Sequence, residues 1–298
     1  MKRRGVRAGD GANLAVRQHG NESASVSIVF AHGWTLGSEL WDDVIARLVD
    51  RFGEDVNIVS YDHRGHGRSD AGPRGSGTLE QLADDLRTVI DVCAPGGKVI
   101  LAGHSMGGMA LLAFAERHRD LLDDRVAGAV FVCTSPGRMW NPLKRLPGFY
   151  LTAPTVLGVN NPRLLRNSWI TRLGLKHGLY GGTAQTHHLN ESIRQMRAVD
   201  PKTYAELGIS MMRHERDGIL GHFAAIPTVV FVGTRDRLTP ARHGRRLAAG
   251  VDGALLLIEP GAGHMVPCER SVSVARELDA LTRAVLSTSV DVIVEQTA

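Results

Sequence analysis

Residues 99–108 read Val-Ile-Leu-Ala-Gly-His-Ser-Met-Gly-Gly and place a serine between an apolar run and a stretch compatible with a helix, residues 106–115. A strand-turn-helix segment of this kind holds its central residue in a sparsely populated backbone conformation. The glycines on both sides let strand and helix approach each other without Cβ clashes. Ser105 is therefore a candidate covalent nucleophile on a sharp turn.

A serine hydroxyl is too weak an acid to attack a carbonyl unaided, so the chain must also supply a base and a group that orients the base. Residues 229–236 read as a buried strand that delivers Asp236 at its C-terminal end, and Pro240 prevents the strand from continuing. Asp217 and Asp252 have neither the preceding strand nor the following proline. Asp236 is the predicted orienting carboxylate.

The candidate base lies further along the chain. The apolar run 255–258 is followed by Gly261-Ala262-Gly263-His264, which places an imidazole on a glycine-flanked loop just beyond a strand end. The chain order is then serine, aspartate, histidine, one of three known orders of a serine triad.

The rest of the chain alternates between strand and helix patterns. Asp10-Gly11 is a turn signal between two short strands, residues 6–8 and 14–18. Thr78 is a candidate N-cap, with Gln81 at the capping-box position of a helix that extends to Cys93. Six near-continuous apolar runs fit parallel strands covered on both faces: 26–31, 56–61, 99–102, 126–133, 229–232 and 254–258. We expect an α/β fold with a mostly parallel, doubly wound, eight-stranded sheet.

The alternation pauses between Ser135 and Ala225, where no comparable strand run occurs. We expect a core of residues 1–135 and 225–288, a helical cap at 136–224 that closes over the serine, and a C-terminal tail at 289–298 without an interpretable pattern. Residues 138–190 contain no Asp or Glu but seven cationic side chains: Arg138, Lys144, Arg145, Arg163, Arg166, Arg172 and Lys176. Two interpretations of this charge imbalance stay open. The cationic side chains attract an anionic substrate or a membrane surface, or they form a solvated face without such a role.

The bulk composition is that of a globular enzyme. The chain has 298 residues and a formal net charge of +4, and nothing beyond that mild basicity supports nucleic-acid binding. We expect no secretory signal and no membrane span, because no apolar stretch is long enough. Three cysteines, Cys93, Cys133 and Cys268, are too few for a disulfide framework, so we expect a cytoplasmic protein; the oligomeric state stays open.

Five blocks of the chain together resemble the α/β-hydrolase superfamily, in its branch of small serine esterases and lipases with a helical cap, similar to monoacylglycerol lipases and lysophospholipases. The resemblance spans nearly the whole chain. The blocks are His32-Gly33-Trp34, Asp62-His63-Arg64-Gly65-His66-Gly67-Arg68-Ser69, Gly103-His104-Ser105-Met106-Gly107-Gly108, Gly233-Thr234-Arg235-Asp236 with Pro240, and Gly263-His264.

The resemblance implies a mechanism without a cofactor. Ser105 attacks an acyl carbonyl, His264 takes its proton, and Asp236 orients and stabilises the imidazole. The backbone N–H groups of Trp34 and Met106 are the implied oxyanion donors. A serine at the turn argues against haloalkane dehalogenases and epoxide hydrolases, which place an aspartate there.

We therefore expect hydrolysis of a carboxylic ester with an apolar acyl group, such as the lipid-like esters monoacylglycerol and lysophospholipid. Acyl transfer, thioester hydrolysis and perhydrolysis use the same triad and remain alternatives. A non-catalytic, ligand-binding member of the fold is a further alternative.

Other polar and aromatic residues are assigned structural roles. His104, His32, Asp62 and Arg64 are expected to brace the loops around the serine. His187 and His188, with His177 nearby, have no carboxylate or cysteine at ligand spacing, so no metal site is expected. Aromatic cap residues form either an acyl or alcohol pocket or the core of the cap: Trp140, Phe149, Tyr150, Trp169 and Tyr180.

Overall fold

The computed structural model describes residues 1–139, 169–182 and 184–297. One eight-stranded sheet runs through the molecule in the order β1-β2-β4-β3-β5-β6-β7-β8. The strands are β1 (Lys2–Arg7), β2 (Asn13–His19), β3 (Val26–Ala31), β4 (Asn57–Tyr61), β5 (Lys98–His104), β6 (Val126–Val132), β7 (Thr228–Gly233) and β8 (Leu255–Glu259). Only the β1/β2 and β2/β4 pairs are antiparallel. The predicted mostly parallel, doubly wound sheet is confirmed.

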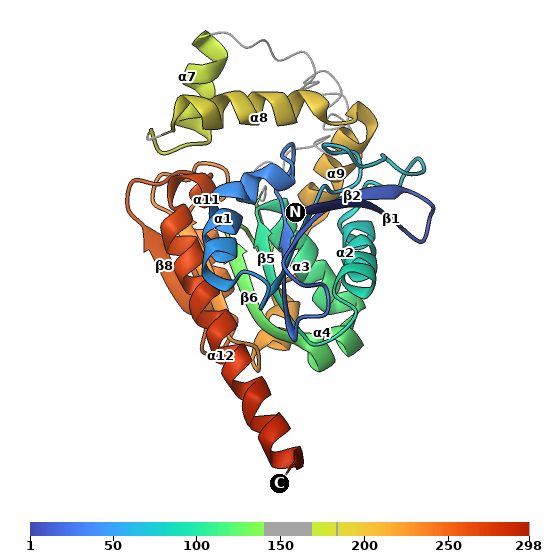
Figure 1. Ribbon diagram of the computed structural model, residues 1–298. Coiled ribbons are helices and arrows are strands. Elements are labelled where there is room, and N and C mark those ends of the chain that lie inside the picture. The colour runs from blue at the N-terminus through green and yellow to red at the C-terminus, as the bar shows by residue number, and fades with distance from the viewer. Residues whose placement is uncertain (140–168, 183, 298) are drawn as a thin grey trace.

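Helices cover both faces of the sheet (Figure 1). On one face lie α1 (Asp42–Phe52), α11 (Val266–Glu269) and α12 (Ser271–Thr297); on the other lie α2 (Leu79–Cys93), α3 (Met106–Arg117) and α10 (Arg242–Ala249). The short helices η1 (Ser38–Trp41), α4 (Arg119–Arg125) and η3 (Asp217–Phe223) complete the body.

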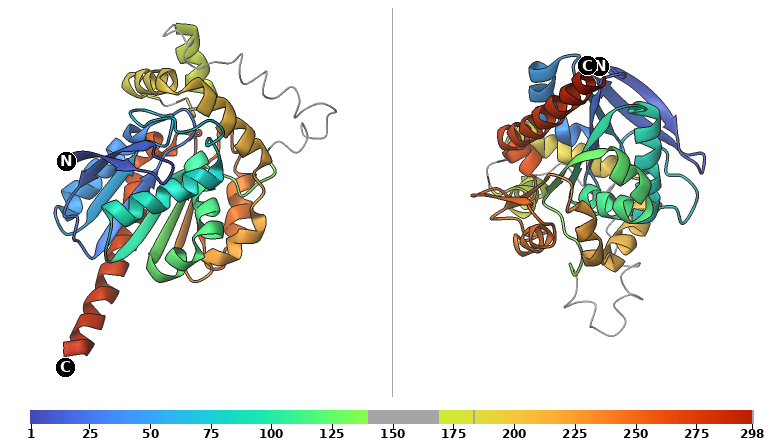
Figure 2. Two further views of the ribbon diagram at one scale, coloured as in Figure 1. Left: turned by 90° about the vertical axis from the view of Figure 1, so that its right-hand side faces the viewer. Right: turned by 90° about the horizontal axis from the view of Figure 1, so that it is seen from below.

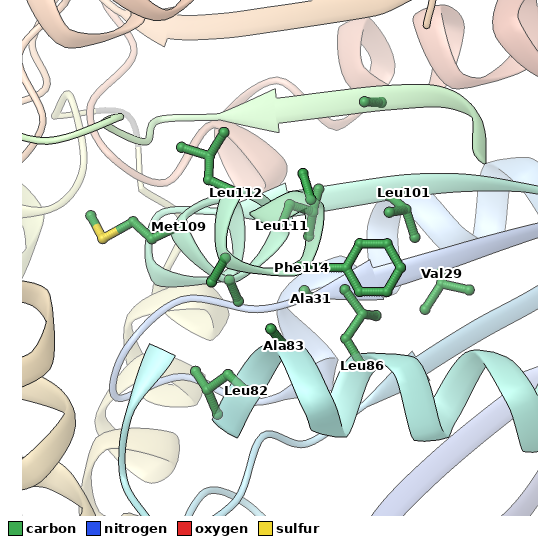
Figure 3. Close-up of a cluster of buried hydrophobic side chains, with 14 of the residues drawn as sticks. Val29, Ala31, Leu82, Ala83, Leu86, Leu101, Met109, Leu111, Leu112 and Phe114 are labelled. Carbon is green, nitrogen blue, oxygen red and sulfur yellow. The ribbon is translucent and has the colours of Figure 1, made fainter. Parts of the chain in front are cut away.

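The two-residue period of the strands divides the core into two layers. Ile28 and Phe30 of β3 pack on the α1 and α12 side, whereas Val29 and Ala31 pack on the α2 and α3 side. Figure 3 shows the second layer, where side chains of α2 and α3 meet those of β3 and β5. Strands buried on both faces explain why the sequence showed continuous apolar runs rather than alternation.

One sequence expectation needs correction. The run 254–258 was expected to be covered on both faces, but β8 pairs only with β7 at the sheet edge and leaves Leu255 and Ile258 exposed. Helix α12 extends from Ser271 to Thr297 and projects from the body (Figure 2), and the C-terminal tail at 289–298 stays a prediction. The Thr78 N-cap is confirmed, because its hydroxyl accepts a hydrogen bond from the N–H of Gln81 at 3.1 Å.

A helical insertion occupies most of the chain between β6 and η3. Its described helices are α7 (Trp169–Gly178), α8 (Thr186–Ala198) and α9 (Pro201–Arg213), which lie over one end of the sheet (Figures 1 and 2). The boundaries of the cap at residues 136 and 224 and its function as a lid stay predictions. Among the described helices, none combines the length and apolar character needed to cross a bilayer.

A buried ion pair connects the loop after β4 to α2 and to the β1–β2 turn. The Arg64 guanidinium, fully buried, donates two hydrogen bonds to Asp85 at 2.6 and 2.7 Å, and further ones to Asp10 and Ser76. The Asp62 carboxylate accepts from the backbone N–H groups of residues 38 and 68. These contacts are those of residues that brace loops.

Removal of the partner of this buried arginine is expected to destabilise the protein strongly. Asp85→Ala leaves the Arg64 charge without its bidentate acceptor, so we expect the free energy of unfolding to fall by about 3–5 kcal/mol in urea denaturation. The control is Asp123→Ala, which removes an exposed pair with Arg119 and should change it by less than about 1 kcal/mol. Equal losses in the two variants would contradict the prediction.

Candidate active site

Ser105 lies on a strained turn between β5 and α3. Its backbone has φ 51° and ψ −115°, a conformation that L-residues rarely adopt, and its side chain is half-buried. A Cβ on Gly107 would lie 2.2 Å from the carbonyl oxygen of Ala31, and one on Gly103 would lie 2.7 Å from the nitrogen of Gly108. The glycines are therefore required by close backbone approach, as the sequence motif predicted.

Asp236 and His264 meet after the carboxyl ends of β7 and β8. Nδ1 of His264 is 2.8 Å from Oδ2 of Asp236, and both side chains are buried. Because a carboxylate can only accept, this contact places the proton on Nδ1 and leaves Nε2 as the basic nitrogen. Thus the structure brings two of the three predicted triad members into direct contact.

The Asp236 carboxylate is fully satisfied by hydrogen bonds. Oδ1 accepts from the N–H groups of Leu238 and Thr239 at 2.8 and 2.9 Å, and the Thr239 hydroxyl lies 2.7 Å from Oδ2. Burial raises the pKa of Asp236, but the His264 imidazole and these hydrogen bonds lower it more, so its pKa lies well below the ordinary value. Thr239 was missed in the sequence, although a threonine three residues after an aspartate is a recognisable local capping pattern.

His104 connects the serine turn to the histidine loop. Its Nε2 donates to the main-chain carbonyl of His264 at 2.8 Å, and the two imidazole centroids are 4.8 Å apart. The residue just before Ser105 is therefore hydrogen-bonded to the loop that carries the predicted base, His264. Within the described residues no hydrogen bond joins the Ser105 hydroxyl to His264, and such bonds often tighten only when substrate is bound.

The loop after β3 carries the first predicted oxyanion donor. Leu36 N–H donates to the Gly33 carbonyl at 3.2 Å, closing a turn in which Thr35 has φ 64° while Trp34 does not have a positive φ. Positive φ at the third turn position is typical of a type II turn and is strained for a threonine. The N–H of Thr35 donates to Nε2 of His66 at 3.1 Å, which holds the central peptide in this orientation.

Three buried histidines brace this loop. His66 Nδ1 donates to the Arg64 carbonyl at 2.9 Å, which leaves Nε2 free to accept from Thr35. The N–H of His63 donates to Nε2 of His32, and their rings lie 4.4 Å apart. Burial lowers the pKa of His66 to about 3 and also lowers the pKa values of His32 and His63, so all three are neutral at pH 7.

The second predicted oxyanion donor is the N–H of Met106, the first residue of α3. It stands at a helix N-terminus, where backbone N–H groups have no partner within the helix and favour negative charge. Gly107 packs against Ala31 and Gly33 packs against His104, so the start of α3 and the loop carrying Trp34 are neighbours.

An aromatic pair forms a wall above this loop. The Trp34 indole stacks on the Tyr204 ring of α9, with centroids 4.4 Å apart and planes 8° apart. Val199 and Tyr204 form a small apolar cluster that Trp34, Ala205, Ile209 and Met212 pack against. Tyr204 was missed in the sequence, because nothing in its local pattern indicates a partner so distant in the chain.

The aromatic residues considered in the sequence analysis have other surroundings. Tyr180 is buried in the apolar layer on the α1 and α12 side of the sheet, and its hydroxyl hydrogen-bonds with Ser192 and the His188 carbonyl of α8, so it packs the insertion onto the body. Trp169 is 74% exposed on α7. Trp140, Phe149 and Tyr150 lie outside the described residues.

A polar cavity of about 370 Å³ opens beside Asp236. Its lining includes the exposed cationic side chains of Arg235 and Arg237, together with His177 of α7. Arg235 also donates to the Gly181 carbonyl at 2.7 Å, which connects the insertion to the loop after β7. Of the cap cations singled out in the sequence, Arg138, Arg172 and Lys176 are described, whereas Lys144, Arg145, Arg163 and Arg166 lie outside the described residues.

Comparison with known proteins gives the family. The profile of the alpha/beta hydrolase family matches residues 28–277, and the chain belongs to this family. A bifunctional esterase/perhydrolase of Acinetobacter calcoaceticus is 26% identical, covering 92% of this chain and 98% of that protein. A non-heme haloperoxidase of Rhodococcus erythropolis is 26% identical, covering 87% and 92%.

Solved structures show the same fold. A thermophilic esterase from Thermogutta terrifontis superposes with a TM-score of 0.76 at 21% identity, covering 96% of this chain and 99% of that one. A bromoperoxidase from Bacillus anthracis gives a TM-score of 0.78 at 17% identity, covering 95% and 100%. The superfamily expectation is therefore confirmed, whereas the branch similar to monoacylglycerol lipases stays a prediction.

Buried neutral histidines are expected to make the protein acid-sensitive. Burial lowers the pKa of His66 and of His104 to about 3, and burial together with Arg216 lowers that of His214 to about 4. Between about pH 6.5 and these values the unfolded chain binds protons that the folded chain does not, so stability falls as the pH falls. Each such histidine contributes a slope of about 1.4 kcal/mol per pH unit.

The measurement is urea denaturation between pH 7.5 and 4.5 of the natural chain and of His214→Gln. A glutamine amide can still donate to the Ser135 carbonyl that His214 Nε2 contacts at 2.9 Å. We expect the slope of stability against pH to become shallower by about one proton in this variant. An unchanged slope would show that His214 does not titrate differently in the folded and unfolded states.

Proposed function

We propose that the protein is a serine hydrolase that cleaves a carboxylic ester through an acyl-enzyme on Ser105. The observation that carries the proposal is the buried contact between Asp236 and His264 beside the strained serine turn. The family match and the relatives named as esterases support it. A buried carboxylate is costly unless it is hydrogen-bonded, and orientation of a catalytic imidazole is a reason to retain it.

The proposed reaction begins with the attack of Ser105 Oγ on the acyl carbonyl carbon, while its proton passes to Nε2 of His264. Asp236 stabilises the imidazolium through the 2.8 Å contact at Nδ1. His264 then returns the proton to the departing alkoxide, which leaves an ester on Ser105. A water molecule, deprotonated by Nε2 of His264, then attacks this ester; the bond to Ser105 Oγ breaks, His264 returns the proton to Oγ, and the carboxylic acid leaves.

Charge that develops on the carbonyl oxygen requires donors that are already oriented. The N–H of Met106 at the start of α3 and the N–H of Trp34 in the braced turn are the proposed donors. Within the described residues the Trp34 N–H donates no backbone hydrogen bond, which leaves it available to the substrate. Each donor of this kind typically lowers the barrier by about 3 kcal/mol.

The Trp34–Tyr204 wall supports an apolar acyl or alcohol group in the substrate. A lipid-like ester, such as a monoacylglycerol or a lysophospholipid, is the finer proposal. Arg235 and Arg237 beside Asp236, together with the basic sequence of the insertion, support an anionic group in the substrate or contact with an anionic membrane surface.

Perhydrolysis is a second candidate, because the relative from Acinetobacter calcoaceticus is named as both an esterase and a perhydrolase. It uses the same acyl-enzyme, with hydrogen peroxide rather than water attacking the ester on Ser105. Acyl transfer and thioester hydrolysis differ likewise only in the second nucleophile or in the leaving group.

The nucleophile is tested by covalent labelling. The natural chain should be labelled by a fluorophosphonate probe and should hydrolyse p-nitrophenyl esters, whereas Ser105→Ala should lose both. Asp236→Asn should retain the fold but lower kcat by about 10⁴-fold, because an amide favours the wrong imidazole tautomer. Absence of labelling in folded natural protein would favour a non-catalytic ligand-binding role. Addition of hydrogen peroxide to the same assay, with peracid measured, tests perhydrolysis.

The aromatic wall is tested with esters of increasing acyl length, together with thioesters and lysophospholipids. Tyr204→Ala removes one face of the stack, so we expect KM to rise several-fold for long acyl chains and little for acetate. Tyr204→Phe preserves the stack and is the control. Equal KM changes for all chain lengths would show that the Trp34–Tyr204 pair does not contact the acyl chain of the substrate.

A further inference from the structure

A cluster of three metal-ligating side chains lies outside the catalytic site, where α8 of the insertion crosses the start of α1. His187 and His188 belong to the first turn of α8, and Asp43 belongs to the first turn of α1. One ligand atom from each side chain lies within 4.8 Å of the others. No carboxylate stands at ligand spacing from these histidines in the sequence, but the fold brings Asp43 to them from 145 residues before His188.

The distances suit a small divalent cation. Nε2 of His188 is 3.1 Å from Oδ2 of Asp43, and the rings of His187 and His188 have centroids 4.0 Å apart. In tetrahedral coordination with bonds of about 2.0–2.1 Å, neighbouring ligand atoms are about 3.3 Å apart. Because Asp43 and His187 are exposed at the surface, small rotations of their side chains can close the remaining gap.

The charges around the cluster also favour a cation. Four carboxylates gather there, those of Glu39, Asp42, Asp43 and Glu191, against the guanidinium groups of Arg17 and Arg194. The surplus is negative, whereas the insertion as a whole is basic in sequence. The helix N-termini of α1 and α8 oppose a cation only weakly at this exposed position, where solvent and salt screen them.

We propose that Asp43, His187 and His188 form a zinc-type metal site that clasps α8 onto α1. Two imidazole nitrogens and one carboxylate oxygen are a donor set that Zn²⁺ prefers, and a water molecule completes the coordination. Without the metal, the His188–Asp43 contact is an ordinary surface pair of little energetic consequence. The metal recruits His187 as well and joins two segments that are far apart in sequence.

The clasp has a structural consequence for the neighbouring loop. Helix α8 already contacts the segment that follows the turn of residues 33–36. Gln195 accepts a hydrogen bond from the N–H of Gly37 at 3.2 Å, and Arg194 pairs with Glu39 at 3.3 Å. A metal at the start of α8 would therefore help to fix the position of the insertion relative to the loop that begins at Gly33.

Zinc titration of the full-length chain tests the site. The protein is stripped with EDTA, dialysed and titrated with Zn²⁺ in competition with a chromophoric chelator at pH 7.5. We expect one zinc ion per chain, with binding weakened at least about 10-fold in Asp43→Asn, His187→Ala and His188→Ala. His177→Ala, which removes another exposed histidine of the insertion, is the matched control and should bind as the natural chain does. Circular dichroism checks that each variant is folded.

A second measurement tests the clasp independently of ester hydrolysis. Zinc should slow amide hydrogen exchange in α8 of the natural chain but not of Asp43→Asn. Failure of the natural chain to bind zinc overturns the proposal, and so does zinc binding without slower exchange in α8. Equal binding by a chain that carries all three substitutions also overturns it, because the ion then sits elsewhere. Among the described residues, the other group of possible metal ligands is the buried set Cys133, Asp236 and His264, which the triple substitution leaves intact.

Discussion

The close approach of two backbones at the carboxyl end of the sheet is the constraint on which the site depends. The first turn of α3 packs against the end of β3 so tightly that a side chain at Gly107 would overlap the Ala31 carbonyl, and one at Gly33 would overlap His104. This packing places Ser105 and the two proposed backbone donors, the N–H groups of Trp34 and Met106, on neighbouring segments. The φ angles of Ser105 and Thr35 are strained, and strain of this kind persists only where the surroundings hold it. The close packing around Gly103 and Gly107 holds Ser105, and the hydrogen bond to His66 holds Thr35.

The electrostatics of this frame follow from burial. His32, His63, His66 and His104 are all buried, and burial lowers the pKa of each, so the rings are neutral. Each ring faces a main-chain carbonyl, which fixes the nitrogen that carries the proton. Asp236 differs from these histidines because it is charged. Burial raises its pKa, but His264 and the hydrogen bonds lower the pKa more, so the carboxyl group stays ionised. The ionised carboxylate therefore lies at Nδ1 of His264, on the side of the ring away from the basic nitrogen Nε2.

The helical insertion is tied to the same loops that carry the site. The N–H of Asp200 donates to the Gly65 carbonyl at 2.7 Å, and Glu206 of α9 accepts from the N–H groups of Gly75 and Gly77. At its base, Gly137 and Glu215 form an isolated β-bridge. Tyr204 of the same helix α9 stacks on Trp34, so the insertion is in direct contact with the loop that carries a proposed oxyanion donor.

Local sequence determined the sheet, the serine turn and the choice of Asp236 and His264, because apolar periodicity, glycine spacing and a proline after the strand are short-range signals. Only the tertiary structure decided that β8 is an exposed edge, that Tyr204 covers Trp34, and that Asp43 joins His187 and His188. Each of these depends on which distant segments pack together. Contacts between residues far apart in the chain leave no periodic trace in either segment, so they exist only once the helices are packed on the sheet.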